Sequence, residues 1–304
     1  MKVFSFMRRP VLKAALGADG FILVAVLWIL AALAALASIY AAYIANTAIS
    51  ARAYDHRLQS KALISAGLEL AAYRVIGFDD NTRPSSGAFD FRIGGSDIGV
   101  EFKSEGARID LNLAPKALLS GLLTAIGVKP QDADVFANHI IAWRTKPTLG
   151  AQNPEADAYK NAGLTYGPRQ SPFQSTAELR LVLGLPAAVV DAALPFVTVF
   201  NGRAEIDANE AAPEVITALP HMNPDTVAKI INQRDPQNPQ AVLSLLGEAR
   251  ASVALGGRKA IRAAVHITLG TVRKVNADVV LLIMEGGEDP YRVLAWSDDF
   301  DGPI

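Results

Sequence analysis

Two short motifs in this chain carry carboxylates at positions where they could do chemistry. Residues 109–112 read IDLN and residues 206–209 read IDAN, and a proline follows each motif within a few residues. A pair of carboxylates can divide the roles of general acid and general base. Asp and Asn just ahead of a proline-started helix are, however, typical of turn and helix caps. We therefore interpret Asp110 and Asp207 as caps, with Asn112 and Asn209 as helix-capping residues.

The remaining chemistry-bearing residues form no recognised catalytic spacing. The chain has no cysteine, which excludes a thiol nucleophile and Cys-ligated zinc or iron–sulfur sites. The sequence contains no Walker A loop, no GxGxxG and no GxSxG, and its histidines are too scattered for an HExxH site. The histidines are His56, His139, His221 and His266. We predict that the protein is not an enzyme.

Composition narrows the class of protein further. The 304 residues include 29 Lys plus Arg and 30 Asp plus Glu, a formal net charge of −1. Hydrophobic residues make up 51% and charged residues 19%, so the chain can bury a core. A length of this order allows one large domain or two ordinary ones. Near-neutral charge argues against a strongly basic nucleic-acid binder.

An apolar segment near the N-terminus indicates a membrane anchor. Residues 21–44 read FILVAVLWILAALAALASIYAAYI, and no Asp, Glu, Lys or Arg occurs from Gly20 to Ala51. A helix of this length spans roughly 36 Å, enough to cross a hydrocarbon core of about 30 Å. The preceding twenty residues carry four basic side chains and only Asp19 as an acid. The positive-inside rule therefore predicts a single-pass protein with a cytoplasmic N-terminus.

Two cleavage sites compete in this region. Ala35-Leu36-Ala37 has the small-x-small form of a secretory signal site, which would leave Ser38 first, but the apolar run continues past it. The alternative lies between Gly20 and Phe21, ahead of the run. A basic leader that ends in Gly before Phe and an apolar helix resembles a type IV pilin-like leader. In such proteins the prepilin peptidase cuts on the cytoplasmic side and the helix stays on the mature chain.

Ala25 is the fifth residue after Gly20. Pilin-like proteins mostly carry Glu at this position, where a carboxylate in the bilayer needs a paired amine from a neighbouring subunit. A subunit at the tip of a filament has no subunit above it, so an apolar residue suits a tip subunit. Taken alone, Ala25 is explained equally well as one of the many alanines of a membrane anchor.

Periodicity predicts further elements after the anchor. Residues 46–76 contain no proline and continue the helix, giving one helix of about 55 residues that is amphipathic in its second half. Alternating apolar residues in 89–93 and 98–102, separated by Gly94-Gly95, predict a β-hairpin. Residues 107–111 are an expected third strand. Three more strands are expected over 263–272, 276–285 and 291–297.

Between these strands lies a weak internal repeat of short helices. Both the IDxN motifs and the helices after them recur, since 137–144 reads ANHIIAWR and 228–234 reads AKIINQR. A third related piece starts at Ser175 as a capping box. The pattern indicates two or three copies of a small helical module.

The order of these motifs resembles the minor pseudopilin K family of type II secretion systems. The resemblance rests on the Gly-then-apolar leader with Trp28, on residues 106–112 (GARIDLN, with one inserted Ala), on 140–144 (IIAWR) and on 173–182 (FQSTAELRLV). It implies an α+β pilin-like fold: a long N-terminal transmembrane helix, an antiparallel sheet and a large all-α insertion of two SAM-like modules. The family also typically lacks Glu at the position of Ala25, which favours the interpretation as a tip subunit.

The resemblance also divides the chain into parts. Residues 1–20 would be the leader, 21–44 the transmembrane helix and 45–112 the helix continuation with the first strands. Two SAM-like modules would occupy 113–205 and 206–257, and the last strands of the head 258–304. The implied role is a minor pseudopilin that nucleates and caps the pseudopilus for export across the outer membrane.

The expected partners are the minor pseudopilins I and J, the major pseudopilin, the prepilin peptidase and the inner-membrane assembly platform. The bulk of the chain would be periplasmic. No cofactor is required, although some family members bind calcium near the loop after Trp-Arg. Here that loop offers only Glu155 and Asp157, whereas calcium takes six to eight oxygens. A solvated loop is the competing interpretation.

Two other functions stay open. The IDxN–proline-helix–Arg pattern resembles helix-hairpin-helix modules of DNA-uptake proteins, whose Gly-x-Gly turn binds phosphate through backbone N–H groups. The matching turn, 219–224 (LPHMNP), has no glycine, and residues 113–250 carry 11 basic against 13 acidic side chains. The second alternative is an anchored scaffold unrelated to pili.

Overall fold

The computed structural model describes residues 18–79, 82–148, 153–235, 238, 240–256, 258–269, 273–284 and 289–299. By its contacts the chain divides into two compact units, Met1–Gln59 and Ser60–Ile304. The described part of the first unit is helical throughout. The second unit holds the sheet and the remaining helices.

One helix, α1 (Ala18–Val75), supplies the whole described part of the first unit and the start of the second. Ala and Leu dominate it and proline is absent, so nothing interrupts its hydrogen bonds. Inside the apolar part, the hydroxyls of Ser38 and Thr47 donate to the carbonyls of Ala34 and Tyr43 at 2.8 and 2.9 Å. The single helix expected from the sequence is thus confirmed.

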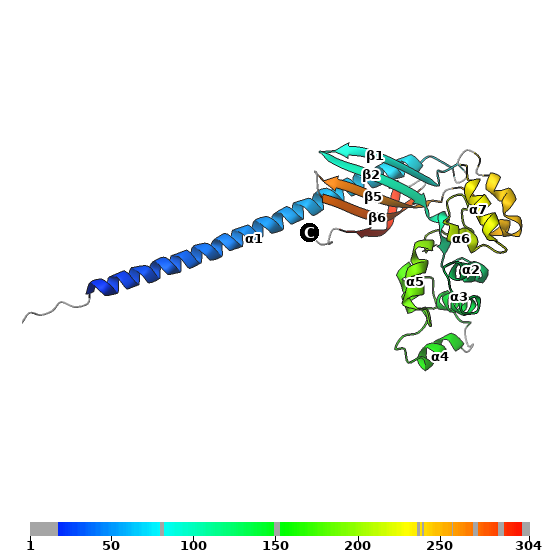
Figure 1. Cartoon of the computed structure of the whole chain (residues 1–304), viewed down its shortest axis with the longest axis horizontal. Coiled ribbons are helices and arrows are strands. Elements are labelled where there is room, and N and C mark those ends of the chain that lie inside the picture. Colours follow the sequence, from blue (N-terminus) through cyan, green and yellow to red (C-terminus); the bar gives the residue numbers. More distant parts are fainter. Residues whose placement is uncertain are drawn as a thin grey trace, which may run out of the picture. The chain divides into compact units, whose positions relative to one another are not determined.

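The sheet of the second unit has five antiparallel strands in the order β1-β2-β5-β6-β7 (Figure 1). Gly94 and Gly95 join β1 to β2 with φ of 56° and 81°, as a two-residue hairpin turn requires. The expected hairpin is therefore confirmed. The strand bounds are β1 (Ser86–Ile93), β2 (Ser96–Ser104), β5 (Ala260–Leu269), β6 (Arg273–Ile283) and β7 (Tyr291–Asp298).

Two of the strands expected from the sequence start three residues too late. β5 begins at Ala260, because Ala260 and Ile261 are buried and pair with Leu282 and Leu281. β6 begins at Arg273, because Arg273 still pairs with Leu269 at the end of β5. The sequence pattern missed this start, since two apolar residues before an arginine do not alternate visibly.

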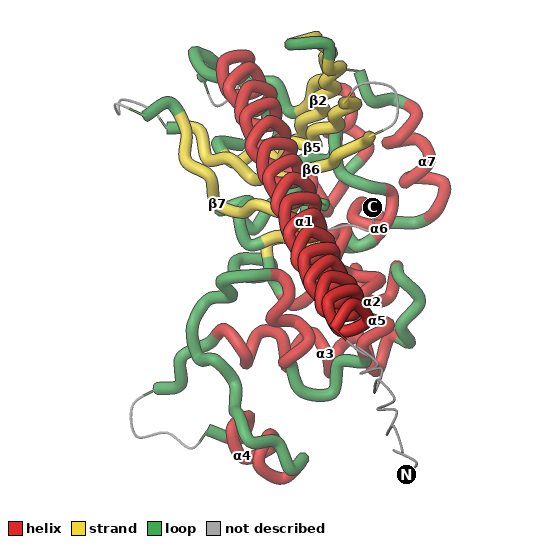
Figure 2. The backbone as a smooth tube through the Cα atoms, turned by 90° about the vertical axis from the view of Figure 1, so that its left-hand side faces the viewer, coloured by secondary structure: helices red, strands yellow, loops and turns green. Residues whose placement is uncertain are grey.

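The C-terminal part of α1 packs on one face of this sheet (Figure 2). Ile64, Leu68 and Ala71 are buried there in one cluster with residues of β2, β5 and β6. A Cβ on Gly67 would lie 3.0 Å from a methyl of Val100, so glycine allows the helix to approach the sheet closely.

A long insertion leaves the sheet between two strands that are direct neighbours. Ser104 at the end of β2 pairs with Ile261 at the start of β5, so residues 105–259 leave the sheet and return to it at the same end of these two strands. Figure 1 shows the helices α2–α7 gathered at that end. They are α2 (Lys116–Ala125), α3 (Pro130–Arg144), α4 (Pro154–Asn161), α5 (Ala187–Ala193), α6 (Pro213–Thr217) and α7 (Pro224–Asn232).

The expected third strand does not join the sheet. Within 107–111 only Ile109–Asp110 (β3) forms a paired strand, and it pairs in parallel with β4 (Val197–Thr198) inside the insertion. The residues before it form a 3-10 turn, η1 (Glu105–Ala107), which turns the chain away from β2. The expectation of a strand over 107–111 is therefore wrong.

The insertion contains two copies of one arrangement. In the first, Ile109 pairs with Val197; in the second, Ile206 forms a parallel bridge with Val253. The capping-box piece is the 3-10 helix η2 (Thr176–Leu181), which lies between α4 and α5 of the first copy and is not a third copy. Buried residues of both copies belong to one hydrophobic cluster.

The two copies touch through their first helices. Gly121 in α2 and Ala218 after α6 each follow the Asp of their motif by eleven residues. A Cβ on Gly121 would lie 2.2 Å from the carbonyl oxygen of Ala218. The contact between the copies therefore requires glycine at this position.

Candidate functional site

The residues expected to direct membrane processing all lie in α1. The helix begins at Ala18, ahead of Gly20, and the side chain of Phe21 is 76% exposed. The most apolar window of this helix has a mean hydropathy of 2.8, and none of it is buried by the rest of the described chain. This surface needs an apolar surrounding, and α1 is long and apolar enough to cross a membrane.

The first IDxN motif builds a turn around a buried carboxylate. The Oδ1 atom of Asp110 accepts from the backbone N–H of Asn112 at 2.8 Å, and its Oδ2 atom accepts from that of Gly202 at 2.9 Å. Burial raises the pKa of Asp110, although these N–H groups oppose the shift. Asn112 does not cap α2, because its side chain exchanges two hydrogen bonds with the backbone of Phe173.

The second motif repeats the turn and ties it to the sheet domain. Asp207 is fully buried, and its carboxylate accepts from the N–H of Asn209 at 3.0 Å and from the hydroxyl of Ser85 at 3.1 Å. Its own N–H donates to the carbonyl of Gly106 at 2.7 Å. Burial raises the pKa of Asp207 to about 6. Both aspartates therefore cap turns ahead of the helices rather than the helices themselves.

An arginine at the end of the second helix completes each copy. Arg144 of α3 donates to the carbonyls of Leu111 and Ala114, the latter at 2.7 Å. Arg234, just after α7, donates to the carbonyls of Ala208, at 3.1 Å, and Ala211. Burial lowers the pKa of both arginines, while nearby carboxylates oppose the shift. These arginines hold the loop of their own motif, so the repeated pattern is a structural device.

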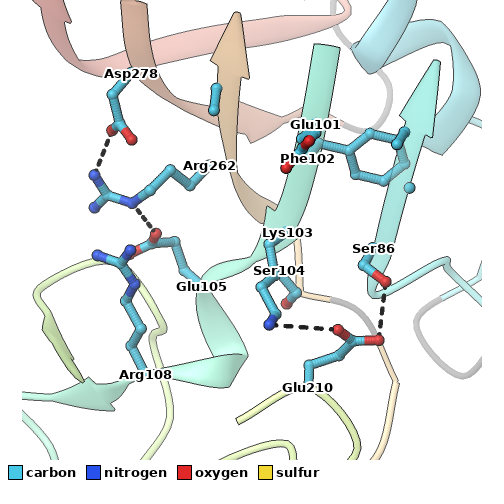
Figure 3. Close-up of a pocket in the computed structure, with 13 residues that line it drawn as sticks. Ser86, Glu101, Phe102, Lys103, Ser104, Glu105, Arg108, Glu210, Arg262 and Asp278 are labelled. Carbon is cyan, nitrogen blue, oxygen red and sulfur yellow. Dashed lines mark hydrogen bonds and ion pairs between the residues drawn. The ribbon is translucent and has the colours of Figure 1, made fainter. Parts of the chain in front are cut away.

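A polar cluster joins the insertion to the sheet (Figure 3). Glu105 is 1% exposed and accepts from Nε of Arg262 at 2.7 Å and from the hydroxyl of Thr198. Arg262 also donates to Asp278 at 2.6 Å. Burial lowers the pKa of Arg262, but the carboxylates of Glu105 and Asp278 outweigh it, so the net shift of this pKa is upward.

A second polar group lies across a pocket from this cluster. Glu210 accepts from the hydroxyl of Ser86 at 2.9 Å and lies 3.8 Å from Nζ of Lys103 (Figure 3). The pocket between the two groups has a volume of about 550 Å³. Sequence analysis missed this site because its residues come from β1, β2, η1, β5, β6 and the position just after the second motif. Its one local signal was the set of charged residues alternating with apolar ones along β2 and β5.

The calcium candidates have protein partners. Glu155 lies 2.8 Å from Nδ1 of His139, linking α4 to α3, and Asp157 lies 3.9 Å from Nζ of Lys160. Within the described residues, no three His, Asp or Glu side chains gather as a metal site would require. Residues 149–152 of this loop lie outside the described part of the chain. Calcium binding here remains a prediction.

The turn compared with a phosphate-binding hairpin has a distinctive backbone. His221, between α6 and α7, has φ of 59°, the left-handed region that favours glycine. Its Nε2 atom lies 3.3 Å from a carboxylate oxygen of Glu248. An acidic side chain therefore lies beside this turn, which is unfavourable for a phosphate.

A known protein family matches part of this chain. Residues 104–202, which contain η1, the first IDxN motif and the first helical copy, match the family model described as "Type II secretion system (T2SS), protein K". Compared with curated protein sequences, the chain matches none.

Among solved structures, the chain is similar to one chain of "The Crystal Structure of the GspK-GspI-GspJ complex from enterotoxigenic Escherichia coli Type 2 Secretion System". The TM-score is 0.56 at 16% identity, and the similarity covers 82% of this chain and 98% of the other. The likeness supports the α+β architecture expected from the sequence, with its long apolar helix, antiparallel sheet and added helices.

Proposed function

We propose that this chain, whose residues 104–202 match the type II secretion system protein K family, is a minor pseudopilin that caps the pseudopilus and nucleates its assembly. The observation that carries the proposal is the insertion of residues 105–259 between the paired strands β2 and β5. This leaves a sheet and a helix of pilin type with an additional helical body at one end of the sheet.

The size of the insertion is the argument for the tip. Subunits inside a filament shaft have neighbours above and below, whereas the subunit at the tip lacks one. A body formed by helices α2–α7 beside the end of the sheet needs the free space that a tip position offers. The role is one of assembly and not of catalysis.

The proposal extends to the membrane and to partners. The chain would sit in the inner membrane through α1, with its N-terminus in the cytoplasm and its bulk in the periplasm. The minor pseudopilins I and J would be its immediate partners, because the similar solved structure is that of a GspK-GspI-GspJ complex. The major pseudopilin and the inner-membrane assembly platform would contact it during assembly.

Processing between Gly20 and Phe21 by the prepilin peptidase is the first part to test. We expect intact mass and N-terminal sequencing of the membrane-extracted protein to show Phe21 as the first residue, with or without one methyl group. A start at Ser38 or an uncut Met1 would contradict the pilin-like pathway. The family assignment of residues 104–202 would survive that result, so the two claims are tested separately.

Ala25 tests the tip position itself. We expect Ala25→Glu to reduce recovery of the complex with subunits I and J, because the new carboxylate has no paired amine in the bilayer. Ala25→Gln is the control, since it places a side chain of nearly the same size at this position without the charge and should lower recovery less. Equal recovery of the complex with Ala25→Glu and with the unmodified chain would show that an apolar residue is not required.

Deletion of residues 114–250 tests the steric argument. We expect the shortened protein to enter the shaft, detected by cross-linking to the major pseudopilin. Continued exclusion of a folded, membrane-inserted deletion variant would count against the role of the insertion.

Calcium at Glu155 and Asp157 stays a prediction of the family resemblance. Its test is the thermal unfolding of the full chain with calcium and with a chelator, beside a Glu155→Gln variant. Equal unfolding temperatures with calcium and with the chelator would contradict a calcium site at these residues.

A further inference from the structure

The pocket of Figure 3 lies on the sheet face opposite to α1, where two rows of side chains cross the strands. In one row, Ala88 pairs with Glu101, Glu101 with Ala264 and Ala264 with Asp278. Because the two alanines are small, space remains beside Glu101. In the next row, Ser86, Lys103 and Arg262 stand side by side and border that space.

Arg108 lines the pocket from the insertion side. Among the described residues, its guanidinium group donates no hydrogen bond and makes no ion pair, and Figure 3 shows it ending beside Glu105. The carboxylates of Glu105 and Asp278 both engage Arg262 instead. Arg108 is partly buried, and burial together with the charge of Arg262 lowers its pKa, although the charges of Glu105 and Asp278 oppose the shift.

A guanidinium group in this state favours an anionic ligand. It offers five N–H donors in a planar fork that fits the two oxygens of a carboxylate. Partial burial has already removed part of the hydration of Arg108, so less desolvation opposes binding. Three of the four acids that line the pocket do not fill this role, since Glu105, Asp278 and Glu210 each contact another basic side chain.

We propose that this pocket binds a carboxylate group, held by the guanidinium of Arg108. The pocket volume of about 550 Å³ has room for one or two side chains. A carboxylate is favoured over a phosphate because Glu101, Glu105, Glu210 and Asp278 surround the same space, and their repulsion grows with the charge of the ligand. The inference does not depend on the proposed tip position.

The carboxylate could come from an acidic side chain or from the end of a chain, and two peptides distinguish these sources. Acetyl-Ala-Glu-Ala-amide presents only a side-chain carboxylate, and acetyl-Ala-Ala-Ala-acid only a terminal one. Acetyl-Ala-Gln-Ala-amide is the neutral control and inorganic phosphate the competing anion. Binding to the full-length chain in detergent is measured by saturation-transfer NMR of the peptide.

Three variants locate the binding. We expect Arg108→Gln to weaken binding of the acidic peptide at least tenfold, the typical effect of losing a charge-assisted hydrogen bond of about 1.5 kcal/mol or more. Arg92→Gln is the matched control, because Arg92 pairs with Asp97 on the exposed hairpin and should leave binding unchanged. Glu101→Gln should strengthen binding by roughly twofold, since it removes a like charge.

A fourth variant separates loss of the pocket from loss of charge. Ala264→Leu keeps Arg108 and fills the space, and we expect it to abolish binding while far-UV circular dichroism stays unchanged. Saturable binding of either acidic peptide with this pattern of variants supports the proposal and identifies the source. Equal binding of the Gln peptide, tighter binding of phosphate, absence of binding, or full binding by Arg108→Gln would overturn it.

Discussion

Asp207 should make the stability of the protein fall as the pH rises through the weakly acidic range. Burial raises the pKa of this carboxyl from its ordinary value of 3.8 to about 6 in the folded chain. The folded state therefore holds a proton on Asp207 at pH values where the unfolded chain has released it. The resulting stabilisation is complete below about pH 4 and is lost as the pH passes through 6.

The size of the effect follows from the shift. A rise of about two pKa units corresponds to about 3 kcal/mol between the two ends of this range. Asp207→Asn removes the charge but keeps a carbonyl oxygen for the N–H of Asn209, and its amide can donate to the Ser85 hydroxyl. We therefore expect the variant to be about 1–3 kcal/mol more stable than the parent at pH 7.5 and nearly equal to it at pH 4.

Urea unfolding of the full chain in detergent at several pH values measures this difference. Trp143 is buried in the hydrophobic cluster that also contains Ile206 and Ala208, so its fluorescence reports on the region around Asp207. Asp191→Asn is the control, because Asp191 is 58% exposed in its surface ion pair with Arg180. Parallel pH profiles for Asp207→Asn and the parent, or a less stable variant at pH 7.5, would refute the reasoning.

Two further substitutions test the repeated copies by the same unfolding assay. Gly121→Ala favours the helix by about 1 kcal/mol but forces its methyl group onto the carbonyl of Ala218, and we expect a net loss of about 1–3 kcal/mol. Gly167→Ala is its control, since a Cβ there meets nothing within 4 Å, and an equal effect at both sites would exclude the clash. Arg144→Ala removes both charge-assisted bonds to motif carbonyls and should cost about 2–4 kcal/mol. Arg180→Ala, at an exposed pair, should change stability by less than about 1 kcal/mol, and similar losses for both arginines would contradict the structural role of Arg144.

The sequence alone was sufficient for the features that depend on neighbouring residues. The apolar composition of residues 21–44 predicts the anchor, because length and hydropathy are properties of a continuous segment. Gly94-Gly95 predicts the hairpin turn, because few other residues adopt its positive φ angles. The IDxN motifs predict the two copies, because each copy builds the same turn and the same arginine contacts from its own residues.

Tertiary structure decided everything that joins distant segments. Nothing local marks Ser104 and Ile261 as neighbours, since their pairing follows from burial of one sheet face under α1. The same is true of the contact between Glu105 and Arg262, which forms only after the insertion returns to the sheet. Burial of Asp207 and partial burial of Arg108 also depend on the packed insertion, because these pKa shifts need removal from water and not merely a motif. Short-range spacing thus determined the parts of this protein, and long-range packing determined which of their charges are buried, paired or left to bind a ligand.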